Sequence, residues 1–151
     1  SGINTSAYGI FNDGVIDTDR GRDILTGQAT TTAGGTAYGI YGQGTINTGN
    51  GNDTLIANGG FGGGGNVFLG NGSDYLKGFG SGSFNGGNGR DTLELTAGTY
   101  TVAISGATVS FTGSNSDGDT VTMNTTSFEQ LIAGSTTYAF SSLSNGRIIT
   151  F

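Results

Sequence analysis

The sequence predicts an all-β fold: a right-handed parallel β-solenoid followed by a C-terminal antiparallel β cap. Three observations predict it. A short turn sequence recurs four times, short strand-like segments separate its copies, and 32 of the 151 residues are glycine. Glycine adopts positive φ angles at little cost, so a chain rich in it forms many sharp corners. Regularly placed Ile, Leu, Val, Phe and Tyr distinguish this chain from a disordered linker.

The composition excludes several classes of function. The chain has no cysteine and no histidine, which removes thiolate or zinc sites and Ser-His or Cys-His nucleophiles. Its net charge is −6 and it has no basic run, so we expect no nucleic-acid binding. No apolar stretch approaches the ~20 residues that span a membrane.

Internal repeats are the strongest signal. "AYGIFNDGVIDTDRGRDILTG" from Ala7 matches "AYGIYGQGTINTGNGNDTLIA" from Ala37, and two shorter copies, "NVFLGNGSDYLKG" and "SFNGGNGRDTLEL", follow. The aspartate of each turn therefore recurs at intervals of 30, 21 and 17 residues. Intervals that shrink while the motif is kept predict stacked coils whose side loops shorten along the chain. The four aspartates are Asp23, Asp53, Asp74 and Asp91.

Each coil is predicted to carry short strands, such as "AYGI", "TIN" and "DTLIA", joined by Gly/Asn corners. Two apolar columns are expected inside the stack. One precedes the turn (Ile16, Ile46, Phe68 and Phe84), and the other follows it (Leu25, Leu55, Leu76 and Leu93). Tyr8 over Tyr38 and Phe11 over Tyr41 are expected to stack in the same way. Nothing in this part of the chain has a helical apolar period.

The chain divides at about residue 95, so we assign 1–95 to the solenoid and 96–151 to the cap. Beyond Ala97 glycine thins out and alternating segments appear: "TYTVAI", "TVSF", "DTVTMN", "TTYAF" and "RIITF". "SNSDGDT" predicts a hairpin with Asp117-Gly118 at a solvated tip. "SFEQLIAG", at 127–134, is compatible with either a short helical turn or a strand. A cap of this kind protects the open end of the sheets.

The recurring turn, G-x-G-x-D-x-L, has the chemistry of a calcium site. Calcium takes six to eight oxygen ligands, and a glycine-rich turn directs carbonyl oxygens inward beside the aspartate. Two turns stacked at the ~4.8 Å spacing of neighbouring strands can share one ion. The candidate ligands are Asp19, Asp23, Gly49, Gly51, Asp53, Gly70, Gly72, Asp74, Gly87, Gly89 and Asp91.

One motif per coil predicts a single row of ions with at most three gaps, of which Asp53–Asp74 is the best candidate. Arg20, Arg22 and Arg90 can neutralise carboxylates in the outer gaps. The alternative is that each aspartate caps its own turn by accepting backbone N–H groups, with no metal.

These turns resemble the RTX nonapeptide repeat, G-G-x-G-x-D-x-U-x with U a large apolar residue, over about residues 15–95. "GGNGRDTLE" matches in full, "TGNGNDTLI" and "LGNGSDYLK" lack the first glycine, and "TDRGRDILT" lacks two. The resemblance implies a calcium-binding parallel β-roll. The C-terminal segment is also similar to the β-rich, uncleaved signals of proteins exported by bacterial type I secretion.

We therefore expect a secreted, non-enzymatic, calcium-binding protein that serves as an extracellular structural or matrix element. The first coil starts midway through a repeat, which predicts an uncapped end that stacks head-to-tail on another copy to form filaments. Two alternatives stay open at this stage. The chain can be a calcium-dependent folding and secretion module of a larger secreted enzyme, or a polysaccharide-binding module.

Overall fold

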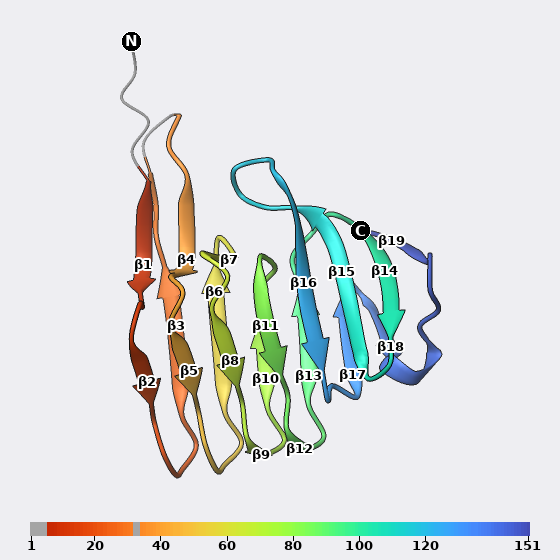
Figure 1. The fold of residues 1–151 in the computed structure, drawn as a ribbon, viewed down its shortest axis with the longest axis horizontal. Helices are drawn as coiled ribbons and strands as arrows, with labels where there is room; N and C mark the ends of the chain where they lie inside the picture. The colour runs from red at the N-terminus through yellow and green to blue at the C-terminus, as the bar shows by residue number, and fades with distance from the viewer. Residues whose placement is uncertain (1–5, 32–33) are drawn as a thin grey trace.

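A computed structural model describes residues 6–31 and 34–151 of the chain. The protein is all-β, with parallel and mixed sheets, none of them closed, and one short 3-10 helix among the described residues. The strands follow one another along a single stack, from β1 at one end to β19 at the other (Figure 1).

Four repeat units, numbered in chain order, supply the first thirteen strands. The first holds β1 (Ala7–Phe11), β2 (Val15–Asp17) and β3 (Ile24–Gln28), and the second holds β4 (Ala37–Tyr41), β5 (Thr45–Asn47) and β6 (Thr54–Asn58). The third holds β7 (Phe61–Gly62), β8 (Asn66–Phe68), β9 (Asn71–Gly72) and β10 (Tyr75–Lys77). The fourth holds β11 (Gly82–Asn85), β12 (Asn88–Gly89) and β13 (Thr92–Leu95).

Equivalent strands of successive units pair in parallel. β1, β4 and β7 form one sheet; β2, β5, β8 and β11 run in a second; β3, β6, β10 and β13 run in a third. β9 and β12 pair at the turns. This is the pairing that the repeats predict: each of the four units supplies one strand to the second sheet and one to the third, and the first three units each supply one to the first sheet.

The column of leucines after the turn is confirmed. Leu25, Leu55, Leu76 and Leu93 are partners in neighbouring strands, and the last three are 0% exposed. Side chains two residues apart in a strand point to the same face, so this column lies on the inner face of its sheet.

The predicted apolar column before the turn is wrong at one position. Val67 pairs with Ile46 and Phe84 and is 4% exposed, whereas Phe68 points outward and is 45% exposed. Val67 stands three residues before the first turn glycine, as Ile46 and Phe84 do, while Phe68 stands two before it. A shift of one residue in a strand moves a side chain to the opposite face.

The predicted aromatic stacks are confirmed on β1 and β4. The rings of Tyr8 and Tyr38 are stacked with centroids 6.5 Å apart, and those of Phe11 and Tyr41 are stacked at 6.1 Å.

The C-terminal segment is more than an antiparallel cap. It comprises β14 (Thr99–Ser105), β15 (Thr108–Ser114), β16 (Thr120–Thr126), β17 (Gln130–Ala133), β18 (Thr136–Ala139), η1 (Phe140–Ser142) and β19 (Ile148–Thr150). Strands β14, β15 and β16 form an antiparallel meander, and β18 and β19 add antiparallel edges. However, β16 pairs in parallel with β11, and β17 pairs in parallel with β13. Strands β16 and β17 therefore continue the repeat stack as a fifth unit.

The hairpin tip between β15 and β16 is confirmed, but it does not simply point into solvent. Gly118 has φ +83° and donates its N–H to the carbonyl of Asn115. The Asp117 carboxylate accepts hydrogen bonds from the hydroxyls of Thr36 and Tyr38, and Asn115 donates to the Tyr38 hydroxyl at 3.1 Å. The tip thus docks on the second repeat unit.

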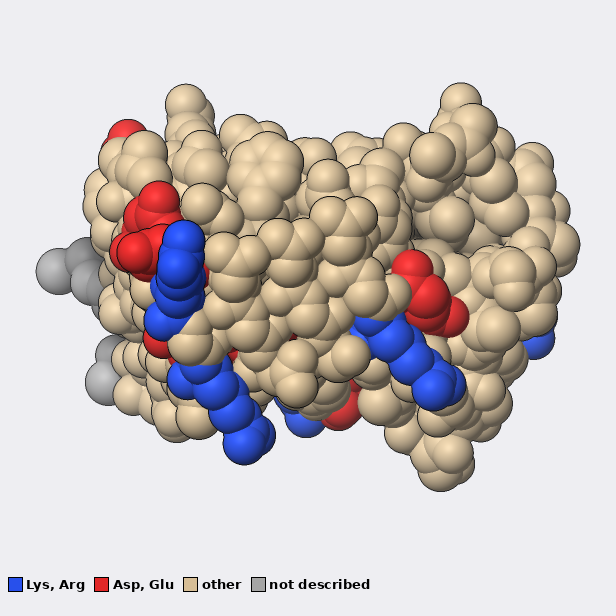
Figure 2. All heavy atoms as spheres, turned by 90° about the horizontal axis from the view of Figure 1, so that it is seen from below, with Lys and Arg blue, Asp and Glu red and all other residues tan. Residues whose placement is uncertain are grey.

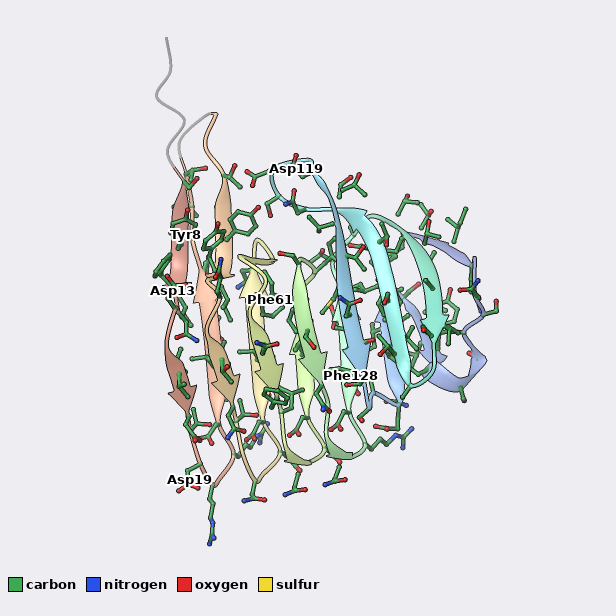
Figure 3. All side chains as sticks on the ribbon, in the orientation of Figure 1. Tyr8, Asp13, Asp19, Phe61, Asp119 and Phe128 are labelled. Carbon is green, nitrogen blue, oxygen red and sulfur yellow. The ribbon has the colours of Figure 1, made fainter. Side chains whose placement is uncertain are left out.

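A continuous apolar core runs through the stack and into the C-terminal segment. It includes Leu55, Phe61 and Leu93 from the repeats and Phe128 and Ile149 from beyond them. Figure 3 shows Phe61 and Phe128 among the side chains that fill the space between the sheets. This core holds the turns in a line.

Candidate metal centre

The glycines of the turns are required by the close stacking of the units. A Cβ on Gly72 would lie 1.6 Å from the carbonyl oxygen of Gly51, and one on Gly51 would lie 1.5 Å from that of Gly21. Gly51 and Gly72 also have φ angles of +153° and +149°, which L-residues rarely adopt. These glycines are therefore no evidence for calcium by themselves, since the backbone packing needs them in any case.

The asparagines of the turns form an exposed ladder on the outside. Asn71 donates its side-chain N–H to Oδ1 of Asn50 at 2.6 Å, and Asn88 donates to Oδ1 of Asn71 at 2.8 Å. The outer edge of the turns is thus held by neutral amides.

The aspartates form a second column on the inner side. In the second, third and fourth turns Oδ1 accepts the backbone N–H of the aspartate in the preceding unit: Asp23 donates to Asp53 at 2.9 Å, Asp53 to Asp74 at 2.7 Å, and Asp74 to Asp91 at 2.9 Å. The hydrogen bonds that these carboxylates accept thus link one unit to the next rather than capping their own turns. Because each aspartate precedes an inward leucine by two residues, its side chain faces the interior.

Glu129 completes this column. Its Oε2 accepts the N–H of Asp91 at 2.6 Å, and Leu131, two residues later, pairs with Leu93. Glu129 therefore occupies the aspartate position of the fifth unit. Sequence reasoning missed it, because the segment lacks the turn glycines. The signal that identifies it is the E-x-L spacing, which repeats D-x-L with a longer acid.

The second carboxylate oxygens carry the chemistry of the site. Oδ2 of Asp23, Asp53, Asp74 and Asp91 is buried and has no hydrogen-bond partner among the residues that the structure describes. Asp53, Asp74 and Asp91 are no more than 2% exposed as whole residues. An unpartnered buried charge is among the costliest features of a folded protein. The column therefore fits a cation, for which these oxygens are ready ligands.

Burial has a further consequence for protonation. It raises the pKa of the Asp91 carboxyl to about 6; the Asp74 N–H bond opposes the rise, and the negative charges of Asp74 and Glu129 add to it. Burial also raises the pKa of the Asp74 carboxyl. Without a cation, the column holds its negative charge at a cost.

The three arginines near the turns do not neutralise this charge. Within the ranges 6–31 and 34–151, the one ion pair joins Lys77 and Glu94 at 2.8 Å, away from the column. Arg20, Arg22 and Arg90 are exposed. The carboxylate column thus lacks a basic partner in the part of the chain that the structure describes.

The other predicted ligands are placed as follows. Gly49, Gly70 and Gly87 stack directly on one another, as do Gly51, Gly72 and Gly89, so their backbones line the turns beside the column. Asp19 is exposed, has φ +68° and lies at the far end of the first turn (Figure 3). It does not belong to the inner column.

The arrangement suits calcium better than a metal held by side chains alone. No group of three or more Asp, Glu, His or Cys side chains in the described residues is gathered closely enough to hold an ion. Each gap offers carboxylates from two units, and turn carbonyls or water must supply the rest. Mixed carboxylate, carbonyl and water ligands are those that calcium accepts.

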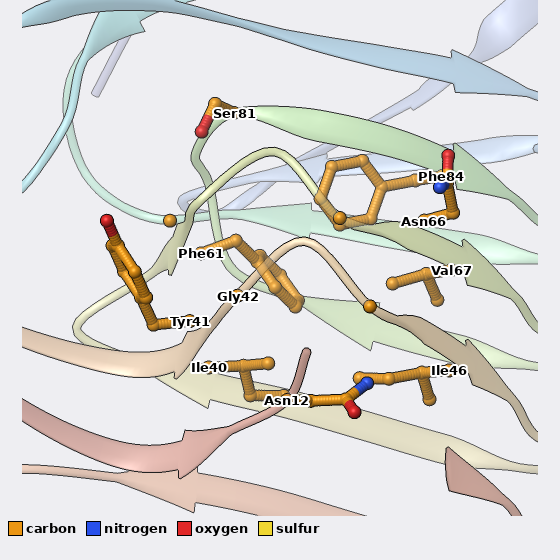
Figure 4. Close-up of a pocket in the computed structure, with 13 residues that line it drawn as sticks. Asn12, Ile40, Tyr41, Gly42, Ile46, Phe61, Asn66, Val67, Ser81 and Phe84 are labelled. Carbon is orange, nitrogen blue, oxygen red and sulfur yellow. The ribbon is translucent and has the colours of Figure 1, made fainter. Parts of the chain in front are cut away.

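Two hollows elsewhere in the molecule carry no comparable chemistry. The pocket in Figure 4, between Asn12, Ile46, Phe61 and Phe84, has a volume of about 20 Å³, room for about one water molecule. A larger hollow of about 270 Å³ lies beneath the hairpin tip, between Gly59, Phe79, Ala97 and Asn115, and no charged residue lines it.

Comparisons with models of protein families, with curated proteins and with solved structures find no match to this chain. No helix in the described part of the chain is long and apolar enough to cross a membrane.

Proposed function

We propose that this protein is a calcium-stabilised, right-handed parallel β-solenoid of the RTX type, which acts as a non-enzymatic structural element outside the cell. The observation that carries the proposal is the inner column of Asp23, Asp53, Asp74 and Asp91, in which each carboxylate keeps one buried oxygen without a partner.

The solenoid part of the proposal is supported by the strand pairing. Leu25, Leu55, Leu76, Leu93 and Leu131 are consecutive partners across five parallel strands. One full turn of chain separates each from the next, so the chain advances by one strand spacing per repeat.

The calcium part is supported by electrostatics. Neighbouring carboxylates stacked at about 4.8 Å repel each other by roughly 3 kcal/mol at an effective dielectric constant of 20. A divalent cation between two units replaces this repulsion with attraction and supplies a partner for both unpaired oxygens. Glu129 extends the column, so four gaps are available instead of the three that the sequence predicts.

The proposed extracellular role rests on the same opposition between carboxylate repulsion and calcium binding. Where calcium is scarce, as in a cytoplasm, repulsion along the column keeps the units apart and the chain open for export. Where calcium is abundant, the ions hold the units together. The proposal therefore includes export by type I secretion and a structural role in the extracellular matrix.

Calcium titration tests the proposal. Addition of calcium to chelator-treated protein is expected to increase the β signal in circular dichroism and to raise the melting temperature. Magnesium should do this weakly, because it demands near-ideal octahedral geometry and gives up water reluctantly. An unchanged spectrum and melting temperature, together with no heat of binding, would refute the calcium role.

A further inference from the structure

The hairpin tip between β15 and β16 reaches back along the stack to the second repeat unit. β16 pairs with β11 and belongs to the fifth unit, whereas the tip contacts β4 and the end of β6. Figure 1 shows the loop that joins β15 to β16 extending towards β7 and β4. The hairpin therefore passes over the third and fourth units and connects the fifth unit to the second.

The shortening of the repeats makes room for this connection. The sheet of β1, β4 and β7 ends at the third unit, and in the part of the chain that the structure describes one bridge, between Phe61 and Gly80, continues its pairing. The tip covers the space beyond β7: the Ser116 hydroxyl donates to the carbonyl of Gly59, and the hollow of about 270 Å³ lies beneath. The falling intervals of 30, 21 and 17 residues between the aspartates thus let the hairpin cross.

Side-chain hydrogen bonds hold the tip on the second unit. The Asp117 carboxylate accepts hydrogen bonds from the hydroxyls of Thr36 and Tyr38. Asn115 donates to the Tyr38 hydroxyl at 3.1 Å, and its Oδ1 accepts the backbone N–H groups of Asp117 and Asp119, which fixes the shape of the tip. We call this set of contacts the latch. Its residues are Thr36, Tyr38, Gly59, Asn115, Ser116 and Asp117.

The two sides of the latch are in the protonation states that its central bond needs. Tyr38 is 4% exposed, and burial raises the pKa of its hydroxyl; the hydrogen bond to Asp117 and the charge of Asp117 raise it further. The hydroxyls of Thr36 and Tyr38 lower the pKa of the Asp117 carboxyl. A neutral phenol therefore donates to an ionised carboxylate at neutral pH, which is the stronger, charge-assisted kind of hydrogen bond.

The latch spans three of the four gaps of the carboxylate column. The second unit carries Asp53, and the fifth carries Glu129. The gaps between these two points, which we call the latched gaps, are Asp53–Asp74, Asp74–Asp91 and Asp91–Glu129. The Asp23–Asp53 gap lies outside the latch.

The tip moves with the fifth unit. β15 and β16 are paired from Val109 to Ser114 and from Thr120 to Thr125, so the hairpin is one rigid piece up to its tip. Any change in spacing or tilt between the fifth and second units therefore displaces Asp117 from Tyr38. A latch that stays closed limits how far the latched gaps can open.

The latch and the turns lie on opposite sides of the stack. In Figure 1 the tip is at the top, and the turns, marked by β9 and β12, are at the bottom. Figure 2 views the turn side, where charged side chains form a few separate groups and most of the surface is uncharged. A substitution in the latch thus leaves the surroundings of the column unaltered, and an effect on calcium must act through the spacing of the units.

We propose that the latch holds the latched gaps at the spacing that calcium binding requires, and that it thereby sets the calcium affinity of the column. This inference rests on the proposed calcium role. Without an ion, repulsion between the carboxylates drives the units apart, and the latch opposes this separation. Calcium then meets gaps that are already close to their bound geometry, and such preorganisation raises affinity. Because coupling between two equilibria is reciprocal, bound calcium also favours the docked tip.

Calorimetric titration of the full chain with calcium tests the proposal on Asp117→Ala, with Asp119→Ala as the matched control. Both substitutions remove one exposed carboxylate from the hairpin tip, so they change the long-range attraction for calcium alike. Only Asp117 belongs to the latch. Asp117→Ala should weaken calcium binding about fivefold or more, whereas Asp119→Ala should leave it nearly unchanged.

A second pair of variants changes no charge at neutral pH. Tyr38→Phe and Tyr41→Phe each remove one hydroxyl from β4, and only the hydroxyl of Tyr38 belongs to the latch. Tyr38→Phe should weaken calcium binding in the same direction as Asp117→Ala, and Tyr41→Phe should not. Circular dichroism confirms that each variant is folded.

Amide hydrogen exchange in chelator gives a readout that needs no calcium. The N–H groups of Asp53, Asp74 and Asp91 each cross one latched gap, and that of Asp23 crosses the gap outside the latch. In Asp117→Ala the first three should exchange faster than in Asp119→Ala, while Asp23 should change little.

The outcomes separate this inference from the calcium role. Native calcium affinity in Asp117→Ala and Tyr38→Phe would overturn the latch and leave the calcium role intact. Faster exchange at Asp23 by the same factor as at Asp74 would also overturn it, since the latch would then contribute general stability alone. If the native protein binds no calcium, the proposed function fails and the coupling fails with it, whatever the exchange rates are.

Discussion

The backbone N–H of Asp53 donates to Oδ1 of Asp74 at 2.7 Å, while Oδ2 of Asp74 is buried without a partner. One oxygen of the carboxylate thus binds the neighbouring unit, and the other remains available to a cation. The same relationship is repeated at Asp53, which accepts the N–H of Asp23, and at Asp91, which accepts the N–H of Asp74.

Asp74→Asn should separate these two roles. Asparagine keeps an oxygen that can accept the Asp53 N–H but removes the charge. In chelator we expect the free energy of unfolding of the variant to exceed that of the native protein by about 1–3 kcal/mol, because a buried unpaired charge is lost. In calcium we expect the order to reverse, since one gap loses a charged ligand. Urea unfolding of both proteins, with chelator and with calcium, measures whether the order of their stabilities reverses.

The control is Asp119→Asn, which makes the same charge change on the exposed hairpin tip, away from the column. Its stability should be nearly unchanged in both conditions. If Asp74→Asn also behaves identically with and without calcium, the aspartate column is not the calcium site.

The turn glycines give a second prediction, based on space. Gly72→Ala would place a methyl group 1.6 Å from the Gly51 carbonyl oxygen, so the units must separate. We expect a loss of about 3 kcal/mol or more in the free energy of unfolding. Gly64→Ala is the matched control: Gly64 has φ +83° but no neighbouring atom within 4 Å of a Cβ. It should cost only about 1–2 kcal/mol, from backbone strain. Similar costs for the two variants would show that the turns are not tightly stacked.

Much of this architecture is predictable from the sequence, because each repeat unit supplies its own register marker. The D-x-L spacing fixes Leu55, Leu76 and Leu93 on the inner face, and the strands around them follow. The prediction of Phe68 in the column before the turn is wrong, because the count from Gly70 places Val67 there. A count that is off by one residue assigns the opposite face of an alternating strand.

The fifth unit was not predicted, because tertiary contacts define it. Glu129 lacks the glycine-rich approach of the other turns, and Ser127 takes the positive φ, +56°, that glycine takes elsewhere. Similarly, the docking of Asp117 on Tyr38 joins residues 79 apart in sequence and leaves no local pattern. Contacts of this kind become visible only in the folded chain.

Glu129→Ala should therefore destabilise the C-terminal end of the stack. It leaves the buried N–H of Asp91 without an acceptor, which costs about 1–3 kcal/mol. Glu129→Gln keeps an acceptor oxygen and should recover most of this loss. Amide hydrogen exchange at Asp91 provides a local readout: it should accelerate in the alanine variant only. Unaltered protection in Glu129→Ala would mean that this bond contributes little.

Stability without metal should have an unusual dependence on pH. The pKa of the Asp91 carboxyl is raised to about 6 in the folded state, above its ordinary value of 3.8. The folded chain therefore binds a proton more tightly than the unfolded chain, and acidification favours folding. As the pH falls from about 7 through 6 towards 4, we expect the metal-free protein to gain roughly 2–3 kcal/mol, at about 1.4 kcal/mol per unit of pKa. The raised pKa of Asp74 acts in the same direction. Denaturant unfolding of the metal-free protein across this range measures the gain, and Asp91→Asn should flatten the profile of stability against pH.

Because protons and calcium compete for the same oxygens, calcium affinity should fall over the same pH interval. A metal-free protein whose stability decreases steadily below pH 7 would show that the buried carboxylates are ionised at little cost, and the electrostatic argument for a cation would fail.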